Sequence, residues 1–585
     1  MNHLRINQAQ RLLHNFWQIA QPYFFSDEKW KARGLFILTT VLMLCFNVFH
    51  IVQSYVLRDL MTAVTDKDVT NFYQIYFQLI GVFAIFVPVF VFWHYSQDLL
   101  QLSWRKWLTK HFLVKYLSNR SYYKLKSNEQ IDNPDQRIAE DIDTFIKSSI
   151  DISGLLVVNI VSIFSFLGIL LSIDKFLTFL AIALAVIQTI IAIFIGGRLS
   201  KLKFKQLEFQ ADFRYGLVHI RDNCESIAFY RGENQELATI QQRFFYVIRN
   251  FHRIINLDRN LNFFTTGTGF IISNLPVVFL APRFFAGEIE FGEIGQASGA
   301  FVTIFTSLGL LVKKFDIFTA FVAQIQRLKT FSEFILEPEK TKDSLLNLPR
   351  IEAKEEASLA IQNLTLKTPQ YERTLVKNLS LSVPKGQGIL IVGHSGVGKS
   401  SLIRALAGLW NSGTGCIIRP QFDQMLFLPQ RPYMILGDLR HQLLYPTNNI
   451  TISAQRLQEE LEYVNLPDLI ERVGGLDTEL NWADFLSLGE QQRLAFARLR
   501  LTQPSYAILD EATSALDVGN EKRLYQLLLD SETTYISVGH RPTLVQYHQY
   551  VLKLVGNGNW KVIPIQDYSF DVAHFHENNR SAGVK

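Results

Sequence analysis

Cysteine is scarce in this sequence of 585 residues, which contains only Cys45, Cys224 and Cys416. The three are far apart, so they form neither the paired spacing of a zinc site nor a disulfide framework. The first 33 residues also lack the short apolar core and the small-residue cleavage site of a secretory signal. We therefore interpret the cysteines as packing residues, and residues 1–33 as a cytoplasmic or interfacial segment with a helix around Leu12–Phe25.

Long apolar runs, in contrast, dominate the chain up to about residue 336. A helix needs about 20 apolar residues to cross about 30 Å of hydrocarbon, and about six runs approach that length. The candidate spans are Gly34–Tyr55, Ile75–Tyr95, Gly154–Ile173, Phe176–Gly196, Asn262–Ala281 and Gln296–Val312. Residues 34–336 are therefore predicted to form an all-helical transmembrane domain embedded in a lipid bilayer.

Basic residues predict the orientation of these spans. Lysine and arginine gather before the first span and after the second, fourth and sixth, whereas the other connections carry few. Because cytoplasmic flanks carry excess positive charge, both termini are expected in the cytoplasm. The same flanks account for the formal net charge of +5, which gives no reason to expect a nucleic acid partner.

The composition changes after the last apolar run. Residues 337–357 are charged and carry the helix breakers Pro338 and Pro349, so we expect a linker there. Residues 358–570 alternate strand-like and helix-like segments and predict a soluble α/β domain, followed by a C-terminal tail at 571–585.

Two polar stretches between spans are long enough to form helical hairpins that project into the cytoplasm. In the first, Asn133 suits an N-cap, Pro134 the first helical position and Gln136 the reciprocal capping position, with Asp135 and Arg137 in the same turn. In the second, Glu225–Glu236, Gly232 is expected to interrupt a helix near a surface turn. Such tips are either ordinary solvated helix ends or contacts to a cytoplasmic domain.

The octapeptide GHSGVGKS at residues 393–400 lies between an apolar strand-like run and a helix-like run. Its glycines let backbone amides turn inward around an anion, and the helix start adds the positive end of its dipole. Lys399 is expected to reach the outer phosphates, and the Ser400 hydroxyl to ligate Mg²⁺. The predicted nucleoside triphosphate cradle comprises Gly393, His394, Ser395, Gly396, Val397, Gly398, Lys399, Ser400 and Ser401.

Further groups suited to phosphate chemistry follow downstream. Asp510 and Glu511 end an apolar strand, where the first can hold Mg²⁺ and the second can polarise an attacking water. Gln430 offers an amide able to contact both the metal and the water, and His540 ends another apolar strand. Alone, Gln430 would be a solvated loop residue and His540 a structural histidine. Their company behind a phosphate loop favours catalysis.

The segment LSLGEQQRLAFARLRL, starting at Leu486, resembles the signature of ATP-binding cassette (ABC) proteins. With the phosphate loop, Gln430, Asp510 with Glu511, SALD at 514–517 and His540, the motifs of that family appear in its order. The resemblance implies an ATPase in which two cassettes face each other head to tail. Ser487 and Gly489 of one copy would then close on the γ-phosphate held by the other, with Glu490 and Asp517 also at that ATP site.

The sequence departs from the signature pattern at two positions, because Leu488 stands where a glycine is usual and Glu490 where a glutamine is usual. Tyr371 is the nearest candidate for an aromatic ring that stacks on adenine. It lies a few residues closer to the phosphate loop than expected.

The membrane half narrows the family. WRKWLT at 104–109, YYKL at 122–125, DNPDQRIAEDI at 132–142 and APRFFAGEI at 281–289 resemble bacterial fused transporters related to the SbmA/BacA peptide and cobalamin uptake proteins, and more distantly the peroxisomal acyl-CoA (ABCD-type) transporters. The resemblance implies an exporter-like (type IV) six-helix domain followed by a P-loop ATPase, in a bacterial inner membrane. It also implies that the tips at 133–137 and 225–236 act as coupling helices on the cassettes.

Polar residues inside the spans bear on the cargo. Asn47, His50 and Ser54 fall on one face of the first span, and Gln78 lies near the start of the second. Because polar groups are costly in hydrocarbon, this stripe should face water or protein. It indicates either a wet cavity or hydrogen bonding between helices.

Three functions remain open at this point. The leading hypothesis is ATP-driven import of large hydrophilic solutes such as cobalamin or peptides, by alternating access in a homodimer. The others are export of lipid or acyl-CoA on the same scaffold, and an ATP-gated channel or regulator.

Overall fold

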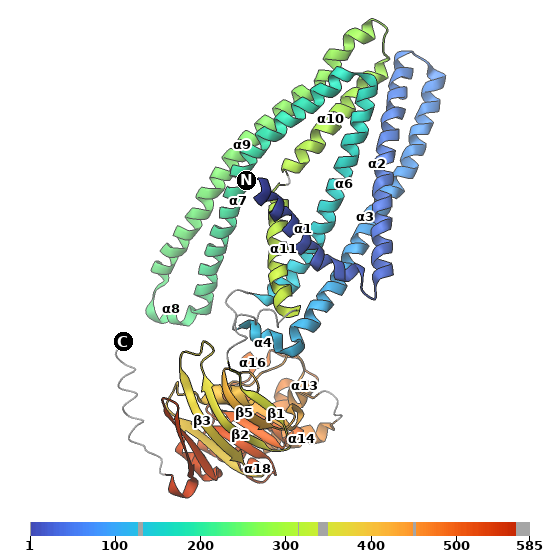
Figure 1. Ribbon diagram of the computed structural model, residues 1–585. Coiled ribbons are helices and arrows are strands. Elements are labelled where there is room, and N and C mark those ends of the chain that lie inside the picture. Colours follow the sequence, from blue (N-terminus) through green and yellow to red (C-terminus); the bar gives the residue numbers. More distant parts are fainter. Residues whose placement is uncertain (1, 127–132, 314, 337–348, 448–451, 569–585) are drawn as a thin grey trace. The chain divides into compact units, whose positions relative to one another are not determined.

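The computed structural model describes residues 2–126, 133–313, 315–336, 349–447 and 452–568 (Figure 1). The prediction for the tail at 571–585 lies outside these residues, as does most of the expected linker. The chain divides into two compact units, Met1–Asp343 and Ser344–Lys585.

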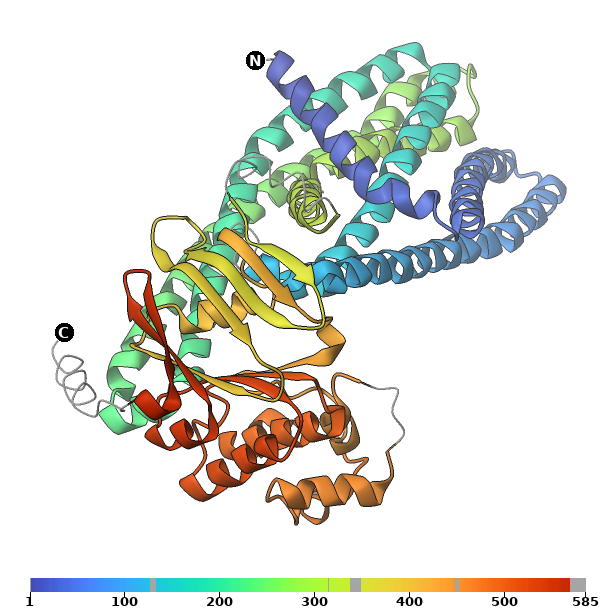
Figure 2. The ribbon, with the colours of Figure 1, turned by 60° about the horizontal axis from the view of Figure 1, so that its bottom comes forward.

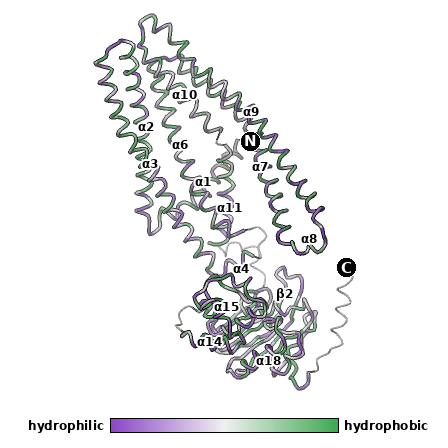
Figure 3. Tube along the Cα trace, turned by 180° about the vertical axis from the view of Figure 1, so that it is seen from behind, coloured by the Kyte–Doolittle hydropathy of each residue, from purple (hydrophilic) through white to green (hydrophobic). Residues whose placement is uncertain are grey.

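Long helices form the first unit. In chain order its helices are α1 (Asn2–Phe24), α2 (Lys29–Thr65), α3 (Val69–Leu117), α4 (Ser121–Lys126), α5 (Pro134–Gln136), α6 (Ile142–Ile173), α7 (Lys175–Asp222), α8 (Cys224–Tyr230), α9 (Glu233–Phe285), α10 (Phe291–Lys313) and α11 (Phe315–Leu336). Apolar residues run along much of these helices (Figure 3), and many large apolar side chains are exposed on them. Such an exterior suits hydrocarbon rather than water.

Four helices of the described chain are long and apolar enough to cross a membrane, namely Lys29–Thr65, Val69–Leu125, Pro134–Ile173 and Glu233–Phe285. They carry the first, second, third and fifth expected spans. The fourth expected span lies on α7, whose apolar part is the shorter Lys175–Ile191, and the sixth lies on α10. All six segments are helical, but the described residues meet the length and hydropathy of a span in four of them.

The second polar stretch forms the expected hairpin. Helices α7 and α9 run side by side beyond their apolar parts and are joined by the short α8 (Figure 1). Arg231 adopts a left-handed conformation with φ of 54°, and Gly232 is the N-cap of α9. The predicted interruption at Gly232 is confirmed.

The first polar stretch differs from the prediction in one detail. A helix does begin at Pro134, but Asn133 has φ of 42° and makes no side-chain capping hydrogen bond. Gln136 donates instead to the Glu140 carboxylate at 3.1 Å, so the expected reciprocal cap does not form. An N-cap residue normally has an extended backbone, and Asn133 is left-handed instead. Five residues of π-helix, Arg137–Asp141, follow.

Helix α1 is longer than predicted and is partly buried. Tyr23 is fully buried and stacks on Trp104 of α3 with ring centroids 5.7 Å apart. Phe331 of α11 stacks on Phe112 of α3 at 5.7 Å. These rings belong to one apolar cluster that joins α1, α3, α6 and α11.

The second unit contains two sheets, whose strands are the yellow to red arrows in Figure 2. The strands are β1 (Glu352–Glu355), β2 (Leu359–Lys367), β3 (Thr374–Val383), β4 (Gly388–Gly393), β5 (Gly413–Arg419), β6 (Met425–Leu428), β7 (Tyr506–Asp510), β8 (Thr534–Val538), β9 (Tyr550–Gly556) and β10 (Asn559–Pro564). The four-stranded sheet has the order β1-β5-β2-β3, and the six-stranded sheet has the order β10-β9-β4-β8-β7-β6. Strand β1 lies within residues 337–357, so the end of the expected linker belongs to a sheet.

Seven helices of the second unit lie in its described residues, namely α12 (Lys399–Leu406), α13 (Leu439–Leu444), α14 (Ala454–Tyr463), α15 (Leu469–Val473), α16 (Trp482–Phe485), α17 (Leu488–Thr502) and α18 (Val518–Leu529). One apolar core joins the two sheets and α12, and a second joins the six-stranded sheet to α13, α14, α17 and α18. The central strands are therefore covered on both faces, as parallel strands require.

Candidate functional site

Four parallel strands bring the predicted catalytic motifs to one edge of the six-stranded sheet. Strands β4, β8, β7 and β6 are parallel neighbours in that order. Gly393 ends β4 and Asp510 ends β7, while Gln430 and His540 each follow the end of a strand by two residues. Ligands of such sheets bind beyond the carboxyl ends of the strands, so these residues share the expected binding edge.

The phosphate loop has a conformation that requires glycine. Gly393, Gly396 and Gly398 have φ values of 154°, 76° and 111°. A Cβ atom on Gly393 would lie 2.6 Å from the carbonyl oxygen of Leu554, and one on Gly398 would lie 3.0 Å from the Leu375 Cβ. Side chains at these positions would push the loop off the neighbouring strands, which explains the glycine spacing.

Lys399 begins α12, and its ammonium group lies over the loop. The Nζ atom donates hydrogen bonds to the carbonyl oxygens of Gly393 at 2.8 Å and His394 at 2.9 Å. Burial lowers the pKa of Lys399, while the negative charges of Glu511 and Asp510 oppose that shift. The cation is thus held where outer phosphates of a nucleotide would bind.

Ser400 and Asp510 form the part of the site that suits a metal. Burial raises the pKa of Asp510, the adjacent Glu511 raises it further, and a hydrogen bond from Ser400 partly offsets this. A hydroxyl oxygen and a crowded, half-buried carboxylate are hard ligands of the kind Mg²⁺ prefers. The residues present therefore fit Mg²⁺.

Glu511 is held between the other two catalytic candidates. Gln430 Nε2 donates to one carboxylate oxygen at 3.0 Å, and His540 Nε2 lies 3.1 Å from the other. Glu511 has φ of 50°, and its backbone amide donates to the Val538 carbonyl at 3.0 Å. Strained backbone held by its surroundings is typical of active sites.

His540 is poised to remain neutral near pH 7. Burial lowers its pKa, the positive charge of Lys399 lowers it further, and Glu511 acts in the opposite direction. A neutral imidazole with its proton on Nε2 can donate to the Glu511 carboxylate. The structure thus joins Gln430, Glu511 and His540 in one hydrogen-bonded group.

The signature segment begins helix α17, with Ser487 as its N-cap. The Ser487 hydroxyl accepts from the Glu490 amide at 3.3 Å, and the Glu490 carboxylate accepts from the Ser487 amide at 2.9 Å. Arg472 donates to the same carboxylate at 2.7 Å. Glutamate in place of glutamine therefore completes a capping box with a charged partner, rather than disrupting the segment.

Gln492 is a site residue that we did not predict. Its side chain is fully buried and donates to the Gln430 carbonyl at 2.9 Å and to the Ser514 hydroxyl at 3.2 Å. Its amide oxygen accepts from the Ala515 amide at 3.1 Å. One side chain of the signature helix thus connects the Gln430 loop to the SALD segment.

Arg541 was also missed. Its guanidinium donates to the carbonyl oxygens of Leu516 at 2.7 Å and Ser514 at 2.9 Å, and to the Glu521 carboxylate at 3.2 Å. Glu521 is buried and also accepts from Thr513 at 3.2 Å. The residue after His540 therefore fixes the segment that follows Glu511. Neither residue type carried a sequence signal, since these contacts join distant parts of the chain.

Two further ATP-site candidates, Asp517 and Tyr371, make hydrogen bonds within their own local segments. Asp517 is the N-cap of α18 and accepts from the Asn520 amide at 2.9 Å. Tyr371, with φ of 63°, donates its hydroxyl to the Pro349 carbonyl at 2.6 Å. The residue that lies against Gly398 is Leu375, and Tyr371 is not among the atoms near it.

In the membrane unit, the two predicted loop tips differ in exposure. Arg137 is buried, donates to the Arg327 carbonyl at 2.8 Å and lies over the Phe331 ring, so it connects the π-helix that precedes α6 to α11. Glu225 is exposed on α8, together with the rings of Phe229 and Tyr230.

The predicted polar stripe of α2 splits into two environments. Asn47 is buried and accepts a hydrogen bond from Ser162 of α6 at 2.9 Å, in line with bonding between helices. His50 and Ser54 line a pocket, whereas Gln78 is exposed on α3 outside it.

Known proteins resemble both units. Residues 19–285 match the family described as ABC transporter transmembrane region 2, and residues 376–514 match the family described as ABC transporter. A Synechocystis protein described as an uncharacterized ABC transporter ATP-binding protein is 44% identical over 548 residues, which cover 92% of this chain and 83% of the relative.

Two relatives carry more specific names. The chloroplastic ABC transporter D family member 2 of Arabidopsis thaliana is 37% identical over 95% of this chain and 89% of its own. The lysosomal cobalamin transporter ABCD4 of Homo sapiens is 31% identical over 95% of this chain and 97% of its own. The chain therefore belongs to the ABC transporter family, as a membrane-embedded half-transporter that couples ATP hydrolysis to transport.

Proposed function

We propose that two copies of this chain form an importer of large hydrophilic solutes, such as cobalamin or peptides, in a bacterial inner membrane. The observation that carries the proposal is the complete catalytic group around Glu511 in a chain that also contains membrane-spanning helices. A regulator that does not turn over ATP has no need of that group.

ATP hydrolysis follows from the positions of these side chains. Ser400, Asp510 and Gln430 would hold Mg²⁺, which neutralises charge on the outer phosphates when bound. Lys399 binds the same phosphates, and Glu511 accepts a proton from the attacking water. His540 and Gln430 keep the Glu511 carboxylate oriented through the hydrogen bonds described above.

A second copy of the chain completes the ATP site in this proposal. Ser487 and Gly489 lie at the N-terminus of α17, whose free amides and dipole suit a phosphate. Within its own chain the Ser487 hydroxyl donates to the Glu490 carboxylate at 2.9 Å, and in this proposal it turns to the γ-phosphate held by the other copy. Head-to-tail pairing would place the N-terminus of α17 of one copy over the phosphate loop of the other, with Asp517 nearby. Tyr371 would lie against the adenine ring.

Movement would reach the spans through the two loop tips, Asn133–Arg137 and Glu225–Glu236, on the cytoplasmic side with both termini. The exposed Phe229 and Tyr230 rings of α8, 79% and 87% exposed, support docking at the second tip. Closure of two cassettes on ATP and their release after hydrolysis would then alternate access to the cargo.

Two observations support a hydrophilic cargo. His50 and Ser54 present polar groups to a pocket within the membrane unit, where such groups are costly unless they serve water or a polar ligand. One relative is named a lysosomal cobalamin transporter.

Uptake by cells tests the proposal. Cells that express the chain should accumulate labelled cobalamin or a labelled peptide faster than cells without it, and Glu511→Gln should remove the gain. Net loss of label would instead support an exporter. Uptake that survives Glu511→Gln would support a channel.

A further inference from the structure

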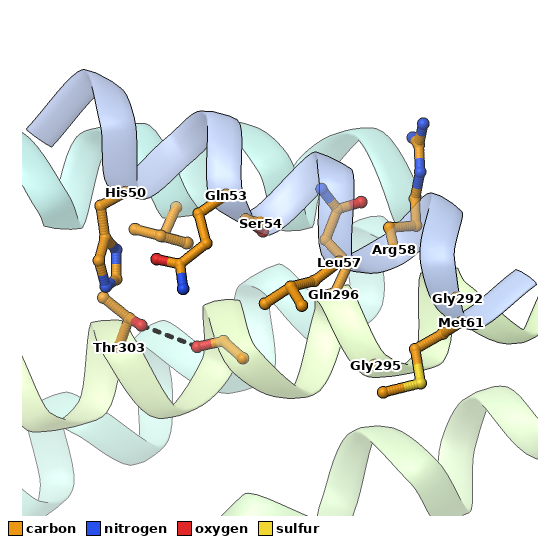
Figure 4. Close-up of a pocket in the computed structure, with 12 residues that line it drawn as sticks. His50, Gln53, Ser54, Leu57, Arg58, Met61, Gly292, Gly295, Gln296 and Thr303 are labelled. Atoms are coloured by element: carbon orange, nitrogen blue, oxygen red, sulfur yellow. Dashed lines mark hydrogen bonds between the residues drawn. The ribbon is translucent and has the colours of Figure 1, made fainter. Parts of the chain in front are cut away.

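A largely apolar pocket with several polar side chains in its wall lies between α2, α6 and α10 of the membrane unit (Figure 4). Its volume is about 290 Å³. His50, Gln53 and Ser54 face it from α2, Phe166 borders it from α6, and Gln296 and Thr303 line it from α10. The pocket follows α10 from Gly292 to Thr303, a length of about 16 Å at the helical rise.

Glycines of α10 explain why the pocket exists. A Cβ atom on Gly292 would lie 2.0 Å from the Arg58 carbonyl oxygen, so the two helices touch there. The Gly292 amide also donates to the Thr62 hydroxyl at 3.3 Å. Further along α10, Gly295 and Gly299 have no atom within 4 Å of a Cβ position. The helices thus meet at Gly292, and the absence of side chains at Gly295 and Gly299 leaves open space.

Gln296 brings a hydrogen-bond donor without a partner to the wall of this pocket. Its side chain is 5% exposed and, within the described residues, its Nε2 has no hydrogen-bond partner. In Figure 4 its amide rises from α10 toward α2, where Gln53 and Ser54 lie. A buried amide donor without a partner is unfavourable, so a ligand group that reached the Gln296 Nε2 atom would gain a hydrogen bond there.

The amide and hydroxyl groups in the pocket wall, on Gln53, Ser54, Gln296 and Thr303, carry no charge. The Arg58 guanidinium points away from α10 in Figure 4, lies 2.7 Å from Asp59 and covers the Tyr55 ring. The Thr303 hydroxyl is bonded to the Gly299 carbonyl at 2.8 Å. The amides of Gln53 and Gln296 can each donate and accept, which suits amide or hydroxyl groups better than phosphate or carboxylate.

We propose that this pocket binds a neutral, amide- or hydroxyl-bearing part of the cargo. The inference rests on the proposed import of hydrophilic solutes and names the chemistry that the membrane unit recognises. At about 30 Å³ for each water-sized group, the volume holds about ten non-hydrogen atoms. The pocket therefore takes one portion of a large solute, with Leu57 and Phe166 as its apolar wall.

Thiol protection tests the pocket directly. Ser54→Cys is introduced into the full chain with Cys45→Ala and Cys416→Ala, reconstituted in phosphatidylcholine nanodiscs and labelled with methyl methanethiosulfonate. Cyanocobalamin or N-acetyl-trialanine amide should slow labelling at position 54. The exposed native Cys224 on α8 serves as an internal control and should remain unprotected.

Two substitutions connect the protection to the pocket. Gly299→Leu places a side chain in the open space beside Gly299, and Gln296→Leu removes the unpaired donor. Each should raise about tenfold the probe concentration that halves the labelling rate at position 54, since one hydrogen bond or the cavity itself is lost. Gly267→Leu on α9, which also has open space at its Cβ position, is the matched control and should change nothing.

The outcomes separate the pocket from the proposed function. Uptake without protection would overturn the pocket and leave the import proposal standing, whereas protection without uptake would do the reverse. A thiol at position 54 that the reagent never reaches would overturn the pocket. So would protection by phosphatidylglycerol nanodiscs without probe, because the occupant would then be a lipid headgroup.

Discussion

Glu511 combines a strained backbone with two hydrogen-bond partners from different strand ends. The carboxylate is held by Gln430 and His540, at 3.0 and 3.1 Å. In our proposal the phosphate loop and Lys399 hold the outer phosphates, whereas Glu511 acts on the attacking water. Binding and hydrolysis should therefore be separable by substitution.

Glu511→Gln should retain ATP binding and lower phosphate release by about a hundredfold or more, since an amide cannot accept the proton of the attacking water. Nucleotide binding and phosphate release by the purified transporter check this. Glu532→Gln, at an exposed position, is the control and should be as active as the parent. Undiminished phosphate release would disprove the role of Glu511.

His548 makes the stability of the nucleotide domain depend on pH. It is 3% exposed, packs against Tyr535 and contacts the Leu544 carbonyl through Nδ1 at 2.7 Å. Burial lowers its pKa to about 4. The unfolded chain, with a pKa near 6.5, then binds the proton more tightly, so stability is complete above pH 6.5 and falls as the pH drops toward 4.

The expected loss of unfolding free energy from His548 is about 2 kcal/mol at pH 5 relative to pH 7.5. Calorimetry of the full chain at both pH values measures it, and His548→Gln should reduce the difference. The exposed His441, replaced in the same way, is the control. An equal pH dependence in His548→Gln and the parent would refute this account.

At the residue scale, short local patterns carried the prediction. The phosphate loop, Asp510, Glu511 and His540 were predicted because each belongs to a contiguous motif, and the structure brings them to one sheet edge. Gln492 and Arg541 were missed because their partners lie elsewhere in the chain. The capping box of Ser487 and Glu490 follows a readable S-x-x-E pattern.

Among the elements, the segments after β7 and β8 are fastened together by Arg541 and Glu521. The carboxylate is buried at 1% exposure and receives Arg541, Thr513 and Thr543. These bonds connect the segments that follow two strand ends, with Glu511 on one and His540 on the other.

Arg541→Ala should destabilise the nucleotide domain by roughly 3 kcal/mol, because it leaves the Glu521 carboxylate buried without its cation. It should also lower ATP turnover by loosening the segment that carries Glu511. Thermal unfolding and phosphate release measure the two effects. Arg523→Ala, whose partner is an exposed carbonyl contact, is the control. An unchanged melting temperature in Arg541→Ala would contradict a stabilising role for the Arg541–Glu521 ion pair.

Helix starts were predicted better than helix ends and helix partners. Pro134 and Gly232 mark real boundaries, since their backbone preferences act locally. The Asn133 cap failed because the backbone there is left-handed. The burial of Tyr23 in α1 depends on Trp104, about 80 residues away, and no local pattern indicates such a contact.

For the whole molecule, the distribution of basic residues predicts which connections face the cytoplasm. The short turn between α2 and α3 contains Lys67, and α8 contains the exposed Cys224. If both termini are cytoplasmic, these two positions lie on opposite sides of the membrane.

A membrane-impermeant maleimide should label Lys67→Cys in spheroplasts whose inner membrane is sealed. Native Cys224 should react only after the membrane is opened. Labelling of Cys224 while the membrane is sealed, and of Lys67→Cys only after it is opened, would show the reverse orientation. The parent chain without the Lys67 substitution gives the background from Cys45 and Cys416.

The central claim is that hydrolysis at the Glu511 site moves a hydrophilic solute toward the cytoplasmic side. Proteoliposomes preloaded with labelled cobalamin test it most directly, because external ATP energises only transporters whose nucleotide domains face outward. The account predicts ATP-dependent loss of label from the lumen, and none with Glu511→Gln. Accumulation of external label in the lumen on addition of ATP would contradict it.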